Sequence, residues 1–461
     1  MIAALLRVAV AATVTIFYRL ERRGPPVPAG PVLLVANHPN SLLDPLILFH
    51  TAGRRSRPLA RAPLFESPIL GTLLRAVRAI PVYRREDDPA QMSRNLDALR
   101  AAMASLAAGD AVQIFPEGRT HSDPAIAPLR TGAARVALGA EAEAEWKLGV
   151  RVVPVGLTYA RKAVFRGHAV ALYGEPMEVR SFRPQLEEDD QAAVRSLTAR
   201  IDQRLRALTL DLTRTEDADL IDAAERVWSL GKGLRSSRQR VRLGERLPRL
   251  QAMARGLAWL RAHHPDRHRR LAARVRRYQR IVAVLGAGEG DVPESYRVRP
   301  ALRWILRRGI PTIALSPIAA VAAVVWGVPY QVIRRAVGQM DLPPEVVATY
   351  KVGAGILLYP GVLALWVSLA AWFVGWRAGL VLTFALPLTG LVAVRWLDLA
   401  AEAVQDLWLL VRLWWPGTRT TRARKMARTR VAAERNRLTA DLDSVLELMG
   451  SRPSPSPDPG A

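Results

Sequence analysis

A histidine and an aspartate stand close together in Asn37–Pro45, directly after the apolar run Pro31–Ala36, which predicts a strand. Near neutral pH, the His38 imidazole can take the proton from a hydroxyl nucleophile. Asp44 can accept a hydrogen bond from the other ring nitrogen, which fixes the tautomer and stabilises the imidazolium. We therefore expect a general-base pair at this strand end; the alternative is a structural histidine in a loop.

A second polar turn follows the β-rich run Ala111–Phe115. Gly118 lets a ligand approach the backbone closely, and Arg119 can form a forked pair with a phosphate. Glu117 is placed to orient a substrate or to hold arginine side chains. This pattern indicates an anion-binding turn; the alternative is a surface turn with a salt bridge.

Short β-rich runs alternate with helical stretches between about residues 31 and 176. The strands are expected at Val32–Ala36, Arg57–Ala62, Ala79–Tyr83, Ala111–Phe115, Arg151–Thr158 and Ala169–Tyr173. The Ala- and Leu-rich stretches Met92–Ala108 and Ala133–Trp146 predict helices. The alternation predicts an α/β fold, a mixed sheet covered by helices, with functional groups on loops at the strand ends.

Together, the two motifs resemble the glycerophospholipid acyltransferase family, which includes glycerol-3-phosphate and lysophosphatidic acid acyltransferases. Further stretches fit the family's remaining blocks, namely Arg61–Phe65 leading through Gly71 to Ile80–Arg84, and Val152–Gly156. By this resemblance, His38 and Asp44 form the catalytic dyad. The implied substrate-binding residues are Arg61, Arg84, Glu117, Gly118 and Arg119.

The resemblance implies an O-acyltransferase that moves a fatty acyl chain from acyl-CoA or acyl-ACP, its co-substrate, to a hydroxyl of glycerol 3-phosphate or 1-acylglycerol 3-phosphate. No cofactor and no metal are expected. Five residues separate His38 from Asp44, where the family usually has four, and the extra residue turns the carboxylate by about 100° if the segment is helical. A rearranged loop is therefore expected. The longer spacing resembles the fungal-type glycerol-3-phosphate and dihydroxyacetone-phosphate acyltransferases and their bacterial relatives.

The composition favours a lipid partner over nucleic acid. Lys and Arg outnumber Asp and Glu by 66 to 41, which gives a net charge of +25, and half of the 461 residues are hydrophobic. Anionic lipid and nucleic acid both attract such a chain, but long uncharged stretches are suited to hydrocarbon. There is no cysteine, so thiolate nucleophiles and disulfides are excluded.

Five regions are expected along the chain. They are an N-terminal membrane-anchoring helix (1–25), an acyltransferase domain (26–183), a basic helical connector (184–307), a transmembrane region (308–400) and a basic amphipathic helix with a disordered tail (401–461). Two or three segments are expected to cross the membrane. The nine basic residues of Arg412–Arg437, with one acidic residue among them, favour the cytoplasmic side. If the catalytic domain is also cytoplasmic, the number of crossings is even.

Other functions remain open at this point. A lysophospholipid-remodelling acyltransferase would use the same chemistry on another acceptor. A non-catalytic membrane scaffold that binds lipid would not need the base His38. A serine hydrolase in its simplest form is excluded, because the chain contains no Gly-x-Ser-x-Gly run.

Overall fold

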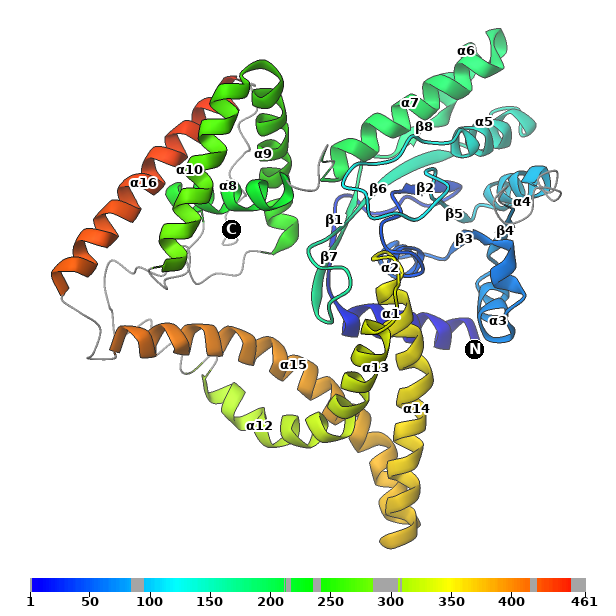
Figure 1. Ribbon diagram of the computed structural model, residues 1–461. Coiled ribbons are helices and arrows are strands. Elements are labelled where there is room, and N and C mark those ends of the chain that lie inside the picture. The colour runs from blue at the N-terminus through cyan, green and yellow to red at the C-terminus, as the bar shows by residue number, and fades with distance from the viewer. Residues whose placement is uncertain are drawn as a thin grey trace. The chain divides into compact units, whose positions relative to one another are not determined.

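The computed structural model describes residues 2–83, 95–210, 212, 217–234, 242–284, 306, 309–414 and 421–448 (Figure 1). The chain divides into two compact units. The first consists of Met1–Thr215 and Leu342–Thr349, and the second of Glu216–Asp341 and Tyr350–Ala461. A short segment from far along the chain therefore belongs to the first unit.

The first unit is built on a mixed eight-stranded sheet with the order β1-β7-β6-β2-β5-β3-β4, and β8 pairs with β6. The strands are β1 (Tyr18–Arg23), β2 (Val32–Ala36), β3 (Ser56–Arg61), β4 (Ile80–Val82), β5 (Ala111–Ile114), β6 (Arg151–Tyr159), β7 (Gly167–Tyr173) and β8 (Met177–Glu178). β2 pairs parallel with β5 and with β6, while β7 runs antiparallel to β6. The carboxyl ends of β2, β5 and β6 therefore meet at one edge of the sheet.

Helices cover both faces of this sheet, which confirms the predicted α/β class. Every residue of β2 is fully buried, as expected for a central strand that is apolar on both faces. Leu33 and Val35 face a core formed with α4 (Asn95–Ala107), α5 (Gly132–Glu143) and α7 (Asp190–Leu208). On the other face lie α1 (Ile2–Phe17) and α2 (Leu43–Thr51), which pack against each other. A short α3 (Pro68–Ala76) and α6 (Arg183–Glu188) complete the unit.

The N-terminal helix is shorter than the 1–25 expected from sequence. α1 ends at Phe17, and Tyr18–Arg23 form β1, which pairs parallel with β7. The side chain of Tyr18 is buried, and its hydroxyl donates to the carbonyl of Lys162. Strand pairing and this buried tyrosine therefore decide the conformation after Phe17, and the apolar run gave no signal of either.

The second unit contains a four-helix bundle that joins distant parts of the chain. Its helices are α8 (Asp217–Gly231), α9 (Leu243–His263), α10 (Pro265–Val284) and α16 (Thr421–Leu448). Glu225 is fully buried and accepts hydrogen bonds from Arg246 and Arg249 of α9. On α16, Asp443 accepts from the Trp228 indole at 2.9 Å. The two arginines compensate the buried Glu225 carboxylate, since an unpaired buried charge is costly.

The second unit also holds the long apolar helices. They are α12 (Ile310–Ala322), a π-helical segment (Ala323–Gly327), α13 (Val328–Gly338), α14 (Val347–Phe373) and α15 (Trp376–Trp414). Within the described part of the chain, three stretches have the length and apolar composition needed to cross a bilayer: Ile310–Gly338, Val347–Phe373 and Trp376–Ala400. This composition indicates membrane association.

Candidate active site

The predicted pair is in contact at the carboxyl edge of the sheet. His38 follows the end of β2, and Asp44 lies in the first turn of α2. His38 Nδ1 is 2.8 Å from Asp44 Oδ2. The Asp44 side chain is fully buried, whereas the His38 side chain keeps 14% of its surface exposed. A buried carboxylate thus holds an imidazole that solvent still reaches.

A left-handed residue accommodates the extra residue between the pair. Ser41 adopts φ 45°, a conformation that is uncommon outside glycine. On either side of it, the Leu43 amide donates to the Asn40 carbonyl at 3.1 Å and the Asp44 amide donates to the Ser41 carbonyl at 3.2 Å. With Ser41 in this conformation, the five residues between the pair still allow the carboxylate to contact the imidazole.

Asp44 accepts two further hydrogen bonds. The backbone amide of Asn40 donates to Oδ2 at 2.6 Å, and the hydroxyl of Tyr159, at the carboxyl end of β6, donates to Oδ1 at 2.5 Å. Burial raises the pKa of Tyr159 well above its ordinary value, and the nearby Asp44 charge raises it further. Tyr159 therefore stays protonated and remains a donor to the carboxylate.

Asn37 fixes the point at which the chain leaves the sheet. Its side-chain amide donates to the carbonyl of Leu157 at 3.0 Å and accepts from the Leu157 amide at 2.7 Å. These two bonds continue the pairing of β2 with β6 through a side chain instead of the backbone. The residue that follows, His38, is therefore placed beyond the strand edge.

Glu117 joins the two sequence motifs. Its Oε1 accepts from the backbone amide of His38 at 2.9 Å, and its Oε2 accepts from the Ala127 amide at 2.8 Å. The His121 ring nitrogen Nε2 also contacts Oε2. Glu117 is almost fully buried, so its carboxylate holds the His38 loop against the loop that follows β5.

The His38 ring is also held on its face. It stacks on Phe115 with the ring centroids 4.1 Å apart and the planes at 19°. Because Asp44 engages Nδ1, the tautomer protonated at Nδ1 leaves the lone pair on Nε2. Ring orientation and tautomer together prepare Nε2 to receive a proton from a substrate hydroxyl.

A lysine lies beside the same loop. Lys162 Nζ donates to the Pro39 carbonyl at 2.9 Å and to Ser122 Oγ at 2.6 Å. Burial lowers the pKa of Lys162, while Glu345, Asp44 and Asp123 act in the opposite direction. The ammonium thus connects the residue after His38 to the turn that contains the second motif.

The predicted substrate-binding residues lie in different environments, and one of them is outside the described residues. Gly118 has φ 71°, and a Cβ there would lie 2.6 Å from Arg130 Nε. Arg119 is exposed and pairs with Asp123 at 3.2 Å. Arg61 is exposed at the carboxyl end of β3, on the same edge of the sheet. Arg84 lies outside the described residues. A substrate-binding role for all five, Glu117 included, stays a prediction.

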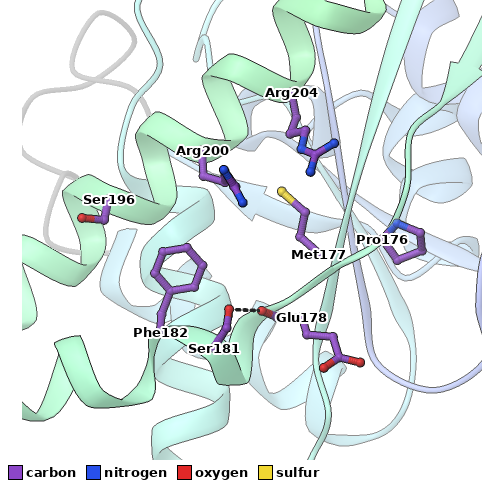
Figure 2. Close-up of a pocket in the computed structure, with 8 residues that line it drawn as sticks. All are labelled: Pro176, Met177, Glu178, Ser181, Phe182, Ser196, Arg200 and Arg204. Carbon is purple, nitrogen blue, oxygen red and sulfur yellow. Dashed lines mark hydrogen bonds between the residues drawn. The ribbon is translucent and has the colours of Figure 1, made fainter.

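A cavity of about 400 Å³ in the first unit lies away from the dyad. Arg200 and Arg204 extend from α7 over Met177 of β8 (Figure 2). β8 pairs with Arg151 and Val152, at the amino end of β6. β6 has nine residues, so this end is roughly 25 Å from its carboxyl end, and the cavity belongs to the edge opposite His38.

Sequence reasoning missed several residues that build the site. Tyr159 and Lys162 follow the predicted strand Arg151–Thr158, and Asn37 and Asn40 lie inside the first motif without an assigned role. The carboxyl end of a neighbouring parallel strand was the available signal for Tyr159. Long-range bonds such as that from Lys162 to Pro39 left no signal in the sequence.

The chain is similar to known proteins over part of its length. The sequence profile of the family described as Acyltransferase matches residues 19–158. The chain is 33% identical over 135 residues to glycerol-3-phosphate O-acyltransferase 2 of Saccharomyces cerevisiae, covering 29% of this chain and 18% of that protein. It is 29% identical over 129 residues to glycerol-3-phosphate O-acyltransferase 1 of the same yeast, covering 27% and 16%.

A solved structure is also similar in part. It is the 1-acyl-sn-glycerophosphate acyltransferase PlsC from Thermotoga maritima, at 20% identity and a TM-score of 0.31, covering 43% of this chain and 80% of that one. The chain spans less than a fifth of the length of the two yeast relatives. The matched residues 19–158 include both His38 and Asp44, so the pair lies in the part of the chain that is similar to the Acyltransferase family.

Proposed function

We propose that the protein transfers a fatty acyl group from an acyl thioester to a hydroxyl of glycerol 3-phosphate. The observation that carries the proposal is the His38–Asp44 contact at 2.8 Å within the matched acyltransferase domain. The two yeast relatives named for glycerol 3-phosphate support this acceptor over 1-acylglycerol 3-phosphate. The thioester carrier is coenzyme A or acyl carrier protein, and no other cofactor takes part.

In the proposed reaction, His38 acts first as a general base and then as a general acid. Nε2 takes the proton of the acceptor hydroxyl while its oxygen attacks the thioester carbonyl. The tetrahedral intermediate then collapses, the C–S bond breaks, and the thiolate leaves with the proton returned by the imidazolium. The buried Asp44 carboxylate stabilises the imidazolium between the two steps. No covalent acyl-enzyme is needed.

Location at a membrane suits this chemistry, because the acyl chain is insoluble and the product is a lipid. The apolar helices provide the attachment. We propose that the acyltransferase domain faces the cytoplasm, where both thioester carriers are found, and the basic stretch 412–437 supports this orientation.

The acceptor is tested by release of thiol from palmitoyl-coenzyme A with detergent-solubilised protein. Glycerol 3-phosphate, dihydroxyacetone phosphate, 1-acylglycerol 3-phosphate and other lysophospholipids are supplied in turn. The absence of cysteine keeps the background of the thiol reagent low. We expect the fastest release with glycerol 3-phosphate. Faster release with a lysophospholipid would assign the chain to a later acylation or to remodelling, and equal release without any acceptor would indicate a thioesterase.

A further inference from the structure

The segment Leu342–Thr349 lies between two apolar helices, yet it belongs to the first unit. Ser122 Oγ donates to Glu345 Oε2 at 2.5 Å. Ser122 in turn accepts from Lys162 Nζ at 2.6 Å, and the same ammonium donates to the Pro39 carbonyl at 2.9 Å. A continuous chain of hydrogen bonds thus connects this segment to the loop that follows His38.

The sidedness of Ile310–Gly338 follows from this placement. The main part of the first unit ends at Thr215, and the chain returns to this unit at Leu342. Among the described residues between these two points, only Ile310–Gly338 has the length and composition of a membrane span. A segment that crosses the bilayer once would leave Leu342–Thr349 on the side opposite His38. Contact between Glu345 and Ser122 requires an even number of crossings in this interval. Ile310–Gly338 must therefore enter and leave on the same side.

The packing of α12 against α15 indicates how far Ile310–Gly338 enters the bilayer. The Trp396 indole of α15 donates to the Thr312 carbonyl at 2.9 Å, and the Trp326 indole donates to the Leu386 carbonyl at 3.2 Å. α12 and α15 therefore run antiparallel. Trp396 is near the end of the apolar stretch Trp376–Ala400, and Leu386 is near its middle. Trp326 thus lies about halfway across the bilayer.

The chain can turn back at that depth. The π-helical segment Ala323–Gly327 interrupts the α-helix, and Pro329 follows it at the start of α13. A π-bulge and a proline are both recognised causes of a helix kink, and α13 leaves the direction of α12 sharply (Figure 1). α13 has 11 residues, or about 16 Å at 1.5 Å per residue, close to half of the roughly 30 Å hydrocarbon core.

The bundle of the second unit gives an independent count. α16 packs with α8 and α10, and Ser444 of α16 accepts from Arg267 of α10 at 2.7 Å. Val284, at the end of α10, and Thr421, at the start of α16, are therefore on one side of the membrane. An even number of crossings must separate them, although three stretches among the residues described there are long enough to cross. α14 and α15 as a crossing pair satisfy this condition.

We propose that Ile310–Gly338 is a re-entrant hairpin that dips into the bilayer and returns to the catalytic side, where it presents Glu345 to the loop that follows His38. α14 and α15 form the membrane-crossing hairpin. Glu345 is then a positioning residue: it holds Ser122 and, through Lys162, the carbonyl of Pro39.

The topology is tested by labelling single cysteines in membrane vesicles with a maleimide that does not cross the bilayer. The chain has no cysteine of its own, so each variant carries one reactive thiol. Arg195→Cys marks the catalytic unit, Asp341→Cys follows the proposed hairpin, and Val374→Cys, 78% exposed, marks the turn between α14 and α15. We expect positions 195 and 341 to react from one side and position 374 from the other. Reaction of 341 together with 374 would show that Ile310–Gly338 crosses and would overturn the proposal.

The placement of Glu345 is tested separately with paired cysteines. A short bis-maleimide should join Ser122→Cys to Glu345→Cys within one chain, and should not join Ser122→Cys to Val374→Cys. No crosslink in the first pair would overturn the proposal even if position 341 were too shielded to label. Neither experiment measures catalysis, so both outcomes are independent of the proposed reaction.

The positioning role rests on the proposed acyl transfer. Glu345→Gln removes one charged acceptor, and we expect kcat to fall about three- to tenfold with the melting temperature and the donor KM unchanged. Asp341→Asn, an exposed acid on the same connection, is the matched control and should retain full kcat. An unchanged kcat in Glu345→Gln would remove the positioning role while leaving the topology intact.

Discussion

The substitution Asp44→Asn separates two roles of the buried carboxylate. Oδ2 accepts from His38 Nδ1 and from the Asn40 backbone amide, and Oδ1 accepts from the Tyr159 hydroxyl. The backbone amide can only donate, so the amide oxygen of asparagine must take the Oδ2 position. Its NH2 group then faces Tyr159, whose hydroxyl can rotate and accept. The imidazole therefore keeps its orientation and its Nδ1–H tautomer, and only the negative charge is lost.

The expected fall in kcat of Asp44→Asn follows from the loss of this negative charge alone. A hydrogen bond to a charged group contributes about 1.5–3 kcal/mol, so kcat should fall between about 10- and 150-fold. Asp44→Ala should lose more activity, because the tautomer is released as well. It should also unfold more easily, since the Asn40 amide and the Tyr159 hydroxyl lose a buried acceptor at a cost of about 1–3 kcal/mol each.

The assay is thiol release at saturating donor and acceptor, with thermal unfolding measured on the same samples. Asp44→Asn should melt close to wild type while its kcat falls. Wild-type kcat in Asp44→Asn would show that the charge at position 44 does not act on His38. A loss as large as that of Asp44→Ala, at an unchanged melting temperature, would show that asparagine does not preserve the tautomer, and the assigned orientation would be wrong.

Four further substitutions have defined outcomes. Tyr159→Phe removes one donor from the buried carboxylate and should lower both the free energy of unfolding, by about 1–2 kcal/mol, and kcat; an unchanged denaturant midpoint would contradict the bond. Glu117→Gln cannot accept from two backbone amides on different oxygens, so one N–H loses its partner and the melting temperature should drop. Gly118→Ala should destabilise by at least about 1–2 kcal/mol, because the residue is left-handed and its Cβ would meet Arg130; equal stability in denaturant titration would be inconsistent with this geometry. Arg119→Ala should leave stability unchanged, because its ion pair is exposed. It should raise the acceptor KM more than the donor KM, and an acceptor KM equal to that of wild type would exclude Arg119 from the acceptor site.

The strands and the contact between His38 and Asp44 could be predicted because their signals are local. Val32–Ala36 is a continuous apolar run, and the polar cluster after it can only lie at a strand end. The expected strand Ala111–Phe115 is also present, as β5, and ends one residue earlier, at Ile114. Parallel pairing of β2 with β5 then brings His38 and Glu117 together, as the two motifs suggested.

Other features depend on contacts between distant residues and had no local signal. The left-handed Ser41 is selected by the Asp44 hydrogen bonds and not by any propensity of serine. β1 exists because β7 pairs with it, although Tyr18–Arg23 carries three arginines and continues an apolar helix. The bond between Ser122 and Glu345 joins residues more than two hundred positions apart.

Acceptor-dependent thiol release in His38→Ala shows whether the imidazole at position 38 takes the proton of the acceptor. His50→Ala is the matched control, because His50 is an exposed histidine at the end of the helix that carries Asp44. We predict that release falls by at least about 100-fold in His38→Ala, the lower range for removal of a general base, while His50→Ala retains wild-type turnover. Equal turnover in wild type and His38→Ala, with both proteins folded, would show that His38 is not the general base.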